Sequence, residues 1–285
     1  MRIRSYAKIN LSLEITGRRA DGLHRIVSVM QTVTLADTLS VERASERSFQ
    51  CSDPGLVHGN LVTAAADAFA RKLGGRDAGY RIRLTKAIPA GAGLGGGSGD
   101  AAATLRCLNA LHGEPLDAES ISQLAASLGS DVPFFLHGGT CLVQGVGELV
   151  SPLPRPAPAW YLLVKPEDAI STGQVYAALT PEEWTDGSVT LTMAGDIRNG
   201  IPGAPGFNGL QEALFRICPQ ALRCFRDVQD TDPLACIVSG SGTTIIGLFQ
   251  TEAAATEAGE MLSGNGYWHA VVTNPDDSDE VNACS

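Results

Sequence analysis

One short stretch, "PAGAGLGGGSGDAA" at residues 89–102, has the composition of a backbone that something approaches closely. It holds six glycines in fourteen positions and then continues into alanines. Such glycines leave main-chain N–H groups accessible, and a helix beginning near Asp100 would direct its positive dipole end at the same place. Ser98 adds a hydroxyl suited to a phosphate or to Mg²⁺. These residue types favour an anion site for a polyphosphate over a purely structural turn.

Two well-known phosphate motifs do not fit this stretch. Gly91, Gly93 and Gly96 form a formal G-x-G-x-x-G, but a dinucleotide-binding unit needs a second strand after the helix, ending in an acidic residue. The residues after 113 predict another helix instead. A Walker P-loop is excluded because no Lys-Ser/Thr pair follows the last glycine.

Two charged residues stand in apolar surroundings. Lys8, one of four lysines, lies in "YAKINL", and Asp131 lies in "GSDVPFF", where a predicted helix ends. A lysine on an alternating strand usually faces solvent, and an aspartate at such a junction is often a cap or turn residue. The aspartate's position also suits a general base, so the residues alone leave both interpretations open.

Basic residues gather at the N-terminus of a chain whose net charge is −10. Within the first 25 residues only Glu14 and Asp21 oppose them. The group is Arg2, Arg4, Lys8, Arg18, Arg19 and Arg25. The pattern indicates either a site for a small anion or a solvated basic face. No basic stripe runs through the chain, so we expect no nucleic-acid partner.

The glycine stretch resembles the phosphate loop of the GHMP kinases, which include galactokinase, homoserine kinase and mevalonate kinase. Three further stretches resemble one branch of that family, which phosphorylates the 2-hydroxyl of a cytidine-diphosphate-linked methylerythritol in non-mevalonate isoprenoid biosynthesis. They are "AKINLSLEITGRRADGLH" (7–24), "GSDVPFFLHGGTCLVQGVGE" (129–148) and "SGSGTTIIGLF" (239–249). The resemblance implies an ATP-dependent kinase with ATP as co-substrate, Mg²⁺, and a small cytidine-diphosphate-linked substrate.

The resemblance also implies roles for single residues. Asp131 becomes the base or the residue that orients the acceptor hydroxyl, and Lys8 pairs with it and steadies the transferred phosphoryl group. The implied substrate contacts are Asn10, Leu23, His24, Val146 and Tyr176. The implied ATP contacts are Asn60, Lys86 and the loop Pro89, Ala90, Gly91, Ala92, Gly93, Leu94, Gly95, Gly96, Gly97, Ser98 and Gly99.

At two of these positions the chain departs from the family pattern. Leu23 stands where the family usually has an aromatic residue that stacks on cytosine, so we expect weaker stacking by about 1 kcal/mol. Gly99 stands where the loop usually has a second serine, which leaves Ser98 as the one hydroxyl there.

Hydrophobic periodicity predicts the elements that must position these residues. In the first half we expect strands over 1–16, 26–43, 80–90 and 139–153, and helices over 59–75, 100–113 and 117–129. In the second half we expect helices over 171–184, 208–227 and 252–264, strands over 160–166, 235–240, 243–249 and 268–274, a turn-rich segment over 185–207, and a mobile acidic tail from 275.

The segment "SPLPRPAPA" (151–159) cannot lie inside a helix or a central strand, so it predicts a domain boundary. We expect an ATP-binding domain over 1–152 and a second domain over 153–285, both α+β. The resemblance implies a ribosomal-S5-like fold for the first domain and a ferredoxin-like fold for the second, with the site in the cleft between them.

Composition limits the remaining possibilities. With 44% hydrophobic and 18% charged residues the chain is typical of a globular protein, and no apolar run approaches the roughly 18 residues that span a bilayer. Seven dispersed cysteines predict neither a disulfide framework nor a metal site. We expect a cytoplasmic monomer or weak dimer. The alternatives are another GHMP kinase, of homoserine or mevalonate type, and a non-catalytic nucleotide-binding module.

Overall fold

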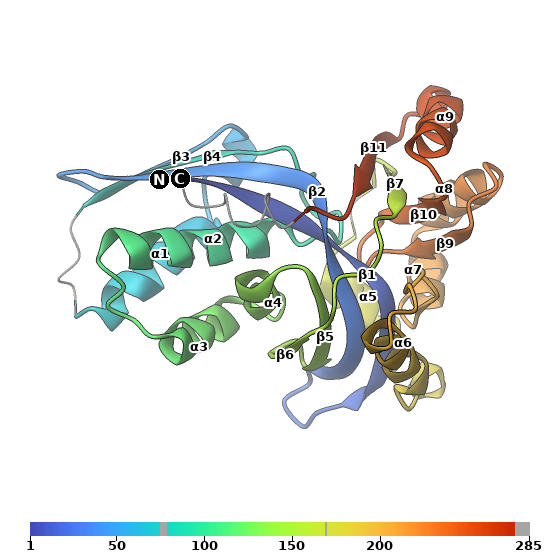
Figure 1. The fold of residues 1–285 in the computed structure, drawn as a ribbon, viewed down its shortest axis with the longest axis horizontal. Helices are drawn as coiled ribbons and strands as arrows, with labels where there is room; N and C mark the ends of the chain where they lie inside the picture. The colour runs from blue at the N-terminus through green and yellow to red at the C-terminus, as the bar shows by residue number, and fades with distance from the viewer. Residues whose placement is uncertain (75–78, 169, 277–285) are drawn as a thin grey trace.

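The computed structural model describes residues 1–74, 79–168 and 170–276, and two long antiparallel strands dominate its first half. These strands, β1 (Arg2–Arg18) and β2 (His24–Arg43), extend beyond the predicted ranges and confirm them (Figure 1). Their register shifts between Tyr6 and Ala7 and again between Asn10 and Ser12. Bulges of this kind re-aim side chains, and the two shifts bracket the segment that carries Lys8.

Two further strands of this sheet pair with different parts of β2. Its residues 38–43 pair with β4 and its residues 26–31 pair with β5. The additional strands are β3 (Ser48–Cys51), β4 (Tyr80–Thr85), β5 (Thr140–Gly145) and β6 (Leu149–Pro152). The strand predicted over 139–153 is therefore a β5–β6 hairpin, broken by a turn at Val146–Glu148.

Four helices lie on one side of the long strands (Figure 1). They are α1 (Leu61–Lys72), α2 (Gly96–Leu111), α3 (Ala118–Leu128) and α4 (Val132–His137). The expected start of α2 near Asp100 was wrong, because the helix begins inside the glycine run. Gly96 and Gly99 have no side chain and so allow the first turn of α2 to pack closely on Ile88 and on β1.

The second half is built on a four-stranded antiparallel sheet in the order β11-β7-β10-β9. This is the 4-1-3-2 order of a ferredoxin-like βαββαβ unit, so the expected fold class is confirmed. Its strands are β7 (Trp160–Lys165), β9 (Ala235–Val238), β10 (Ile245–Phe249) and β11 (Trp268–Thr273). The helices α8 (Pro219–Gln229) and α9 (Glu252–Leu262) pack against it.

Three predictions in this half need correction. The helix over 171–184 stops early as α5 (Thr172–Ala177), and a 3₁₀ turn at Pro181–Glu183 follows. Pro219 divides the helix over 208–227 into α7 (Gln211–Ile217) and α8, because proline cannot donate in a helix interior. The segment expected to consist of turns contains α6 (Ser188–Arg198).

Contacts with the first half stabilise α6 and the short strand after it. The Glu14 carboxylate on β1 accepts a hydrogen bond from the Thr190 amide in the first turn of α6, at 2.7 Å. The strand β8 (Phe207–Asn208) then pairs in parallel with β1. The proline-rich segment lies between β6 of the first sheet and β7 of the second, while a boundary at residues 152 and 153 stays a prediction.

Within the described residues, no helix is long and apolar enough to cross a bilayer. The acidic tail beyond Asp276 lies outside the described residues, so its expected mobility stays a prediction.

Candidate active site

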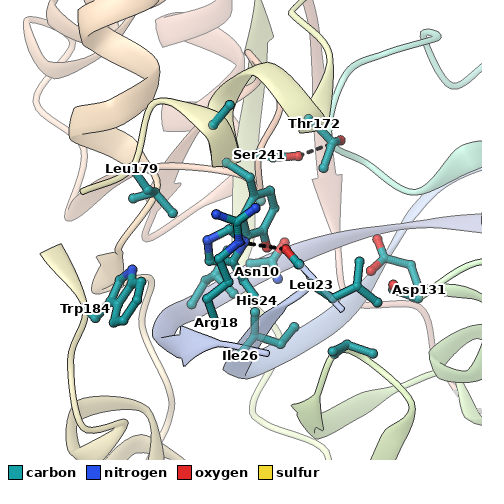
Figure 2. Close-up of a pocket in the computed structure, with 18 of the residues that line it drawn as sticks. Asn10, Arg18, Leu23, His24, Ile26, Asp131, Thr172, Leu179, Trp184 and Ser241 are labelled. Atoms are coloured by element: carbon teal, nitrogen blue, oxygen red, sulfur yellow. Dashed lines mark hydrogen bonds between the residues drawn. The ribbon is translucent and has the colours of Figure 1, made fainter. Parts of the chain in front are cut away.

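A cavity of about 810 Å³ opens where β1, the start of β2, α2 and α5 come together (Figure 2). It collects most of the side chains that the sequence singled out for chemistry or for substrate binding. Those lining it are Lys8, Asn10, Leu23, His24, Ser98, Asp131, Val146 and Tyr176. Segments far apart in the sequence therefore meet around one space.

The two expected catalytic residues face each other at this cavity. The Nζ atom of Lys8 lies 3.7 Å from Oδ2 of Asp131. The lysine side chain is 4% exposed, whereas the aspartate side chain is 32% exposed and therefore open to a ligand. Burial lowers the pKa of Lys8, and the Asp131 carboxylate opposes that shift. The pair thus combines a buried lysine ammonium with a carboxylate that a ligand can reach.

Asp131 does not cap the helix that follows it. It occupies the N-cap position of α4, but its side chain makes no capping hydrogen bond. The carboxylate is therefore not committed to the α4 backbone, and the structural role that the sequence left open does not account for it.

Asn10 lies on the same strand face as Lys8, as alternation along a strand requires. Its Oδ1 accepts from Lys8 Nζ at 2.7 Å, and its Nδ2 donates to Ser28 Oγ at 2.8 Å. Ser28 in turn donates to the carbonyl of Ser12 at 2.7 Å. This chain of hydrogen bonds fixes the lysine in one position beneath the cavity.

The glycine loop presents the first turn of α2 without a cap. Gly95 is the N-cap residue in the left-handed conformation, with φ +71°, and no side chain caps the helix. The first backbone N–H groups of any helix lack partners within it, and here Ser98, in this first turn, lines the cavity. Gly97 is exposed, and a Cβ there would meet only Leu61, at 3.7 Å. The arrangement suits a phosphate group.

A second glycine-containing loop, residues 239–243, packs against the first. A Cβ on Gly93 would lie 2.4 Å from the carbonyl oxygen of Ser239, and one on Gly242 would lie 2.3 Å from the amide of Gly93. Ser239 Oγ also donates to the Gly93 carbonyl at 3.3 Å. Both glycines are needed because the two backbones touch.

Of the expected ATP contacts, Ser98 lines the cavity, whereas Asn60, Lys86 and the other residues of the loop 89–99 do not. Asn60 caps α1, accepting from the Val62 amide at 2.9 Å. Lys86 donates to Asp37 and, at 3.0 Å, to Asp100. Burial acts to lower the pKa of Lys86, but the two carboxylates outweigh it and raise that pKa.

Lys86 nevertheless lies beside the loop, since a Cβ on Gly96 would be 3.2 Å from its Nζ. Burial raises the pKa of Asp100 to about 6, against the effect of Lys86. Asp100 therefore belongs to a buried ion cluster behind the loop.

His24 and Tyr176 form a ring pair in the cavity. Their ring centroids are 5.0 Å apart and the planes are inclined by 34°. Burial, and secondly the charge of Arg18, lower the pKa of His24. Burial, and secondly Asp131, raise the pKa of Tyr176. A neutral imidazole beside a neutral phenol is suited to the face and polar edge of a base.

The two departures from the family pattern have different surroundings. Leu23 is 51% exposed at the cavity. Gly99 faces away from it, since a Cβ there would lie 2.8 Å from Ser5 Oγ on β1. Position 99 therefore points toward the sheet, while Ser98 lines the cavity.

The backbone amide of Val146 is not available to a ligand. Its amide already donates to Glu148 Oε2 at 2.6 Å. A contact from Val146 to a ligand would therefore use its carbonyl oxygen or its side chain.

Many lining residues were not assigned from the sequence. They include Arg18, Thr172, Trp184, Gly240 and Ser241. Arg18 belonged to the basic N-terminal group, and Gly240 and Ser241 belonged to the quoted "SGSG" stretch. The sequence therefore contained a pattern that could have pointed to these three residues. The hydroxyls of Thr172 and Ser241 form a hydrogen bond at 2.9 Å (Figure 2). No local sequence pattern predicts this pairing.

Comparisons with known proteins agree with this geometry. Residues 60–139 match the family description "GHMP kinases N terminal domain" and residues 193–267 match "GHMP kinases C terminal". The chain is 38% identical over 278 residues to a protein of Desulfitobacterium hafniense named 4-diphosphocytidyl-2-C-methyl-D-erythritol kinase, covering 95% of this chain and 94% of that protein. It is 34% identical to a protein of the same name from Thermodesulfovibrio yellowstonii, covering 94% and 96% respectively.

Solved structures show the same likeness. A crystal structure of a 4-(cytidine 5'-diphospho)-2C-methyl-D-erythritol kinase has a TM-score of 0.82 and 32% identity, covering 97% of this chain and 100% of the other. A homoserine kinase from Cytophaga hutchinsonii shares the fold, with a TM-score of 0.71 at 19% identity, covering 96% and 94%. By the matches of both domains and the identity along nearly its whole length, the chain belongs to the GHMP kinase family.

Proposed function

We propose that this protein transfers the γ-phosphoryl group of ATP to the 2-hydroxyl of 4-diphosphocytidyl-2-C-methyl-D-erythritol. The observation that carries the proposal is one cavity with the Lys8–Asp131 pair at one side and the His24–Tyr176 rings along it. An alcohol can react at the first feature while a nucleobase is held at the second. The relatives above carry the name of this activity.

The residues account for the reaction in simple terms. Phosphoryl transfer needs an aligned hydroxyl, an acceptor for its proton and compensation of phosphoryl charge. The Asp131 carboxylate accepts a hydrogen bond from the substrate hydroxyl and takes or orients its proton. The Lys8 ammonium lies beside Asp131 and offsets charge on the transferred group. The uncapped first turn of α2 holds the nucleotide phosphates.

The residues present also fit a magnesium ion carried by the nucleotide. Ser98 places a hydroxyl at the cavity beside the loop, and Mg²⁺ prefers phosphate, hydroxyl and water oxygens. The ion would neutralise phosphate charge during transfer. Among the described residues no group of three His, Cys, Asp or Glu is placed to hold a metal, which is consistent with a metal held mainly by phosphates.

The test is ADP release in a coupled assay with ATP, Mg²⁺ and a panel of alcohols. We expect turnover of 4-diphosphocytidyl-2-C-methyl-D-erythritol to exceed that of homoserine and mevalonate by a wide margin. Equal or faster turnover of either of those would assign the chain to another kinase of the family. Binding of ATP without ADP release on any alcohol would identify a non-catalytic module.

A further inference from the structure

Arg18 is a cation in the cavity wall that the mechanism above does not use. It ends β1, and its Nε donates to the carbonyl of Gly22 at 3.0 Å, which closes the turn before His24. Figure 2 shows Arg18 next to His24, with Trp184 on one side of the view and Asp131 on the other. Arg18 is exposed and lines the cavity.

The charge of Arg18 is not neutralised by the protein around it. Lys8 and Asp131, which also line the cavity, face each other and largely offset one another. Across the ranges 1–74, 79–168 and 170–276, no carboxylate lies within ion-pair distance of Arg18. Arg19, the next residue, pairs with Asp21 at 2.9 Å. The cavity lining therefore carries one unbalanced positive charge, at Arg18.

Arg18 lies beside His24, which belongs to the place proposed for the base. With the base at the His24–Tyr176 rings and the reacting polyol at Asp131, the diphosphate that joins them begins next to the rings and so comes near Arg18. A planar guanidinium with free N–H groups matches phosphate oxygens in geometry as well as in charge. Burial, and secondly the charge of Arg18, lower the pKa of His24, as expected when a cation is nearby.

We infer that Arg18 binds the diphosphate of the nucleoside-diphosphate substrate and so fixes the distance between the base and the reacting hydroxyl. The inference rests on the proposed function. It makes Arg18 a binding residue for the acceptor substrate and not for ATP, whose phosphates lie at the first turn of α2.

The test is calorimetric binding of cytidine, cytidine monophosphate and cytidine diphosphate, without ATP. The proteins are wild type, Arg18→Gln, Arg18→Lys and the matched control Arg19→Gln, which removes a neighbouring arginine that is already paired. We expect Arg18→Gln to weaken cytidine diphosphate binding by about tenfold, the scale of a charge-assisted hydrogen bond. Cytidine binding should stay nearly unchanged, and Arg19→Gln should behave as wild type.

The series separates a phosphate contact from a structural role. If Arg18 only shaped the turn, Arg18→Gln would weaken cytidine and cytidine diphosphate equally, and the inference would be overturned. Arg18→Lys, which keeps the charge and loses the planar fork, should bind cytidine diphosphate with intermediate strength; it also serves if the glutamine variant folds poorly. Wild-type protein that binds none of the three ligands would instead contradict the proposed substrate itself.

Discussion

At the scale of single residues, the site depends on a lysine that the protein keeps buried and oriented. A buried ammonium is costly unless it is hydrogen-bonded and paired. Here Asn10 accepts at 2.7 Å and the Asp131 carboxylate lies 3.7 Å away. Because Ser28 and the Ser12 carbonyl hold Asn10 in turn, the lysine stays in place before any ligand arrives.

The first prediction concerns Lys8 and Asp131 as one unit. Asp131→Asn is nearly isosteric, so folding and binding should survive, while kcat should fall about 100-fold or more, as for loss of a positioned acid–base group. Lys8→Met should have a similar effect. The double variant should be little worse than either single variant, because residues that act together are not additive. The measurement is kcat at saturating ATP and substrate.

Circular dichroism provides the folding control, and Lys72→Met, on the exposed face of α1, is the matched lysine variant. An Asp131→Asn enzyme with nearly wild-type kcat would show that another residue is the base. Losses that multiply in the double variant would mean that the two residues act independently.

At this scale the sequence could identify residues chiefly where a motif surrounded them. Lys8, Asn10, His24 and Asp131 lie in stretches that resemble the family, Tyr176 was expected from the resemblance without such a stretch, and all five line the cavity. Trp184 follows a 3₁₀ turn after α5 and reaches the cavity through tertiary packing. No spacing in the sequence relates it to the other lining residues.

At the scale of elements, the glycines of the phosphate loop have two different tasks. Some allow other groups to pack closely on the loop: a Cβ on Gly95 would lie 2.7 Å from the Phe135 ring and 3.0 Å from Cγ of Lys8. Others leave space on the open side, as Gly97 does. A change at Gly95 would disturb Lys8 directly, so Gly97 is the better probe of nucleotide binding.

The second prediction is that Gly97→Val raises the KM for ATP by about tenfold or more, the loss expected when contacts to phosphate are blocked. The fold should tolerate it, since a Cβ at this position meets only Leu61, at 3.7 Å. Gly195→Val, inside α6 with nothing within 4 Å of its Cβ position, is the control. Steady-state kinetics and thermal melting check both variants; unchanged ATP kinetics in folded Gly97→Val would place the phosphates elsewhere.

The elements were predictable where local pattern and tertiary contacts agree. Alternation identified β1 and β2, and periodicity identified the helices over 59–75 and 117–129, which are α1 and α3 with Asn60 and Asp117 as their N-caps. The helix α6 was missed because "SVTLT" is rich in β-branched residues with low helix propensity. Its first turn is stabilised from another element, by the Glu14 carboxylate, and no local window contains that contact.

At the scale of the whole molecule, the active site is assembled from both halves. The loop 239–243 belongs to the second sheet, yet a Cβ on Gly240 would lie 3.0 Å from Lys8 Nζ and 3.1 Å from Asn10 Oδ1. The resemblance implied a site between two domains, and Gly93 and Gly242, one from each half of the chain, are in backbone contact. The position of one half therefore affects the lysine of the other.

Asn208 is the side chain that ties this loop to the first sheet. It lies on β8, which pairs with β1, and is 7% exposed. Its Nδ2 donates to the carbonyls of Val238 and Gly240, both at 2.8 Å, and its Oδ1 accepts from the Leu210 amide at 2.8 Å. Removing it would leave three buried backbone groups without partners.

The third prediction is therefore that Asn208→Ala lowers both stability and turnover. Buried unpartnered groups cost about 2–4 kcal/mol, which for a chain of this size corresponds to a fall in Tm of roughly 5–10 °C. The kcat should fall as well, because Gly240 would no longer be held against Lys8. Asn199→Ala, at the exposed end of α6, should change neither. Asn208→Ala with a lowered Tm but wild-type kcat and KM, measured well below its Tm, would mean that the loop's attachment stabilises the fold without positioning the catalytic lysine.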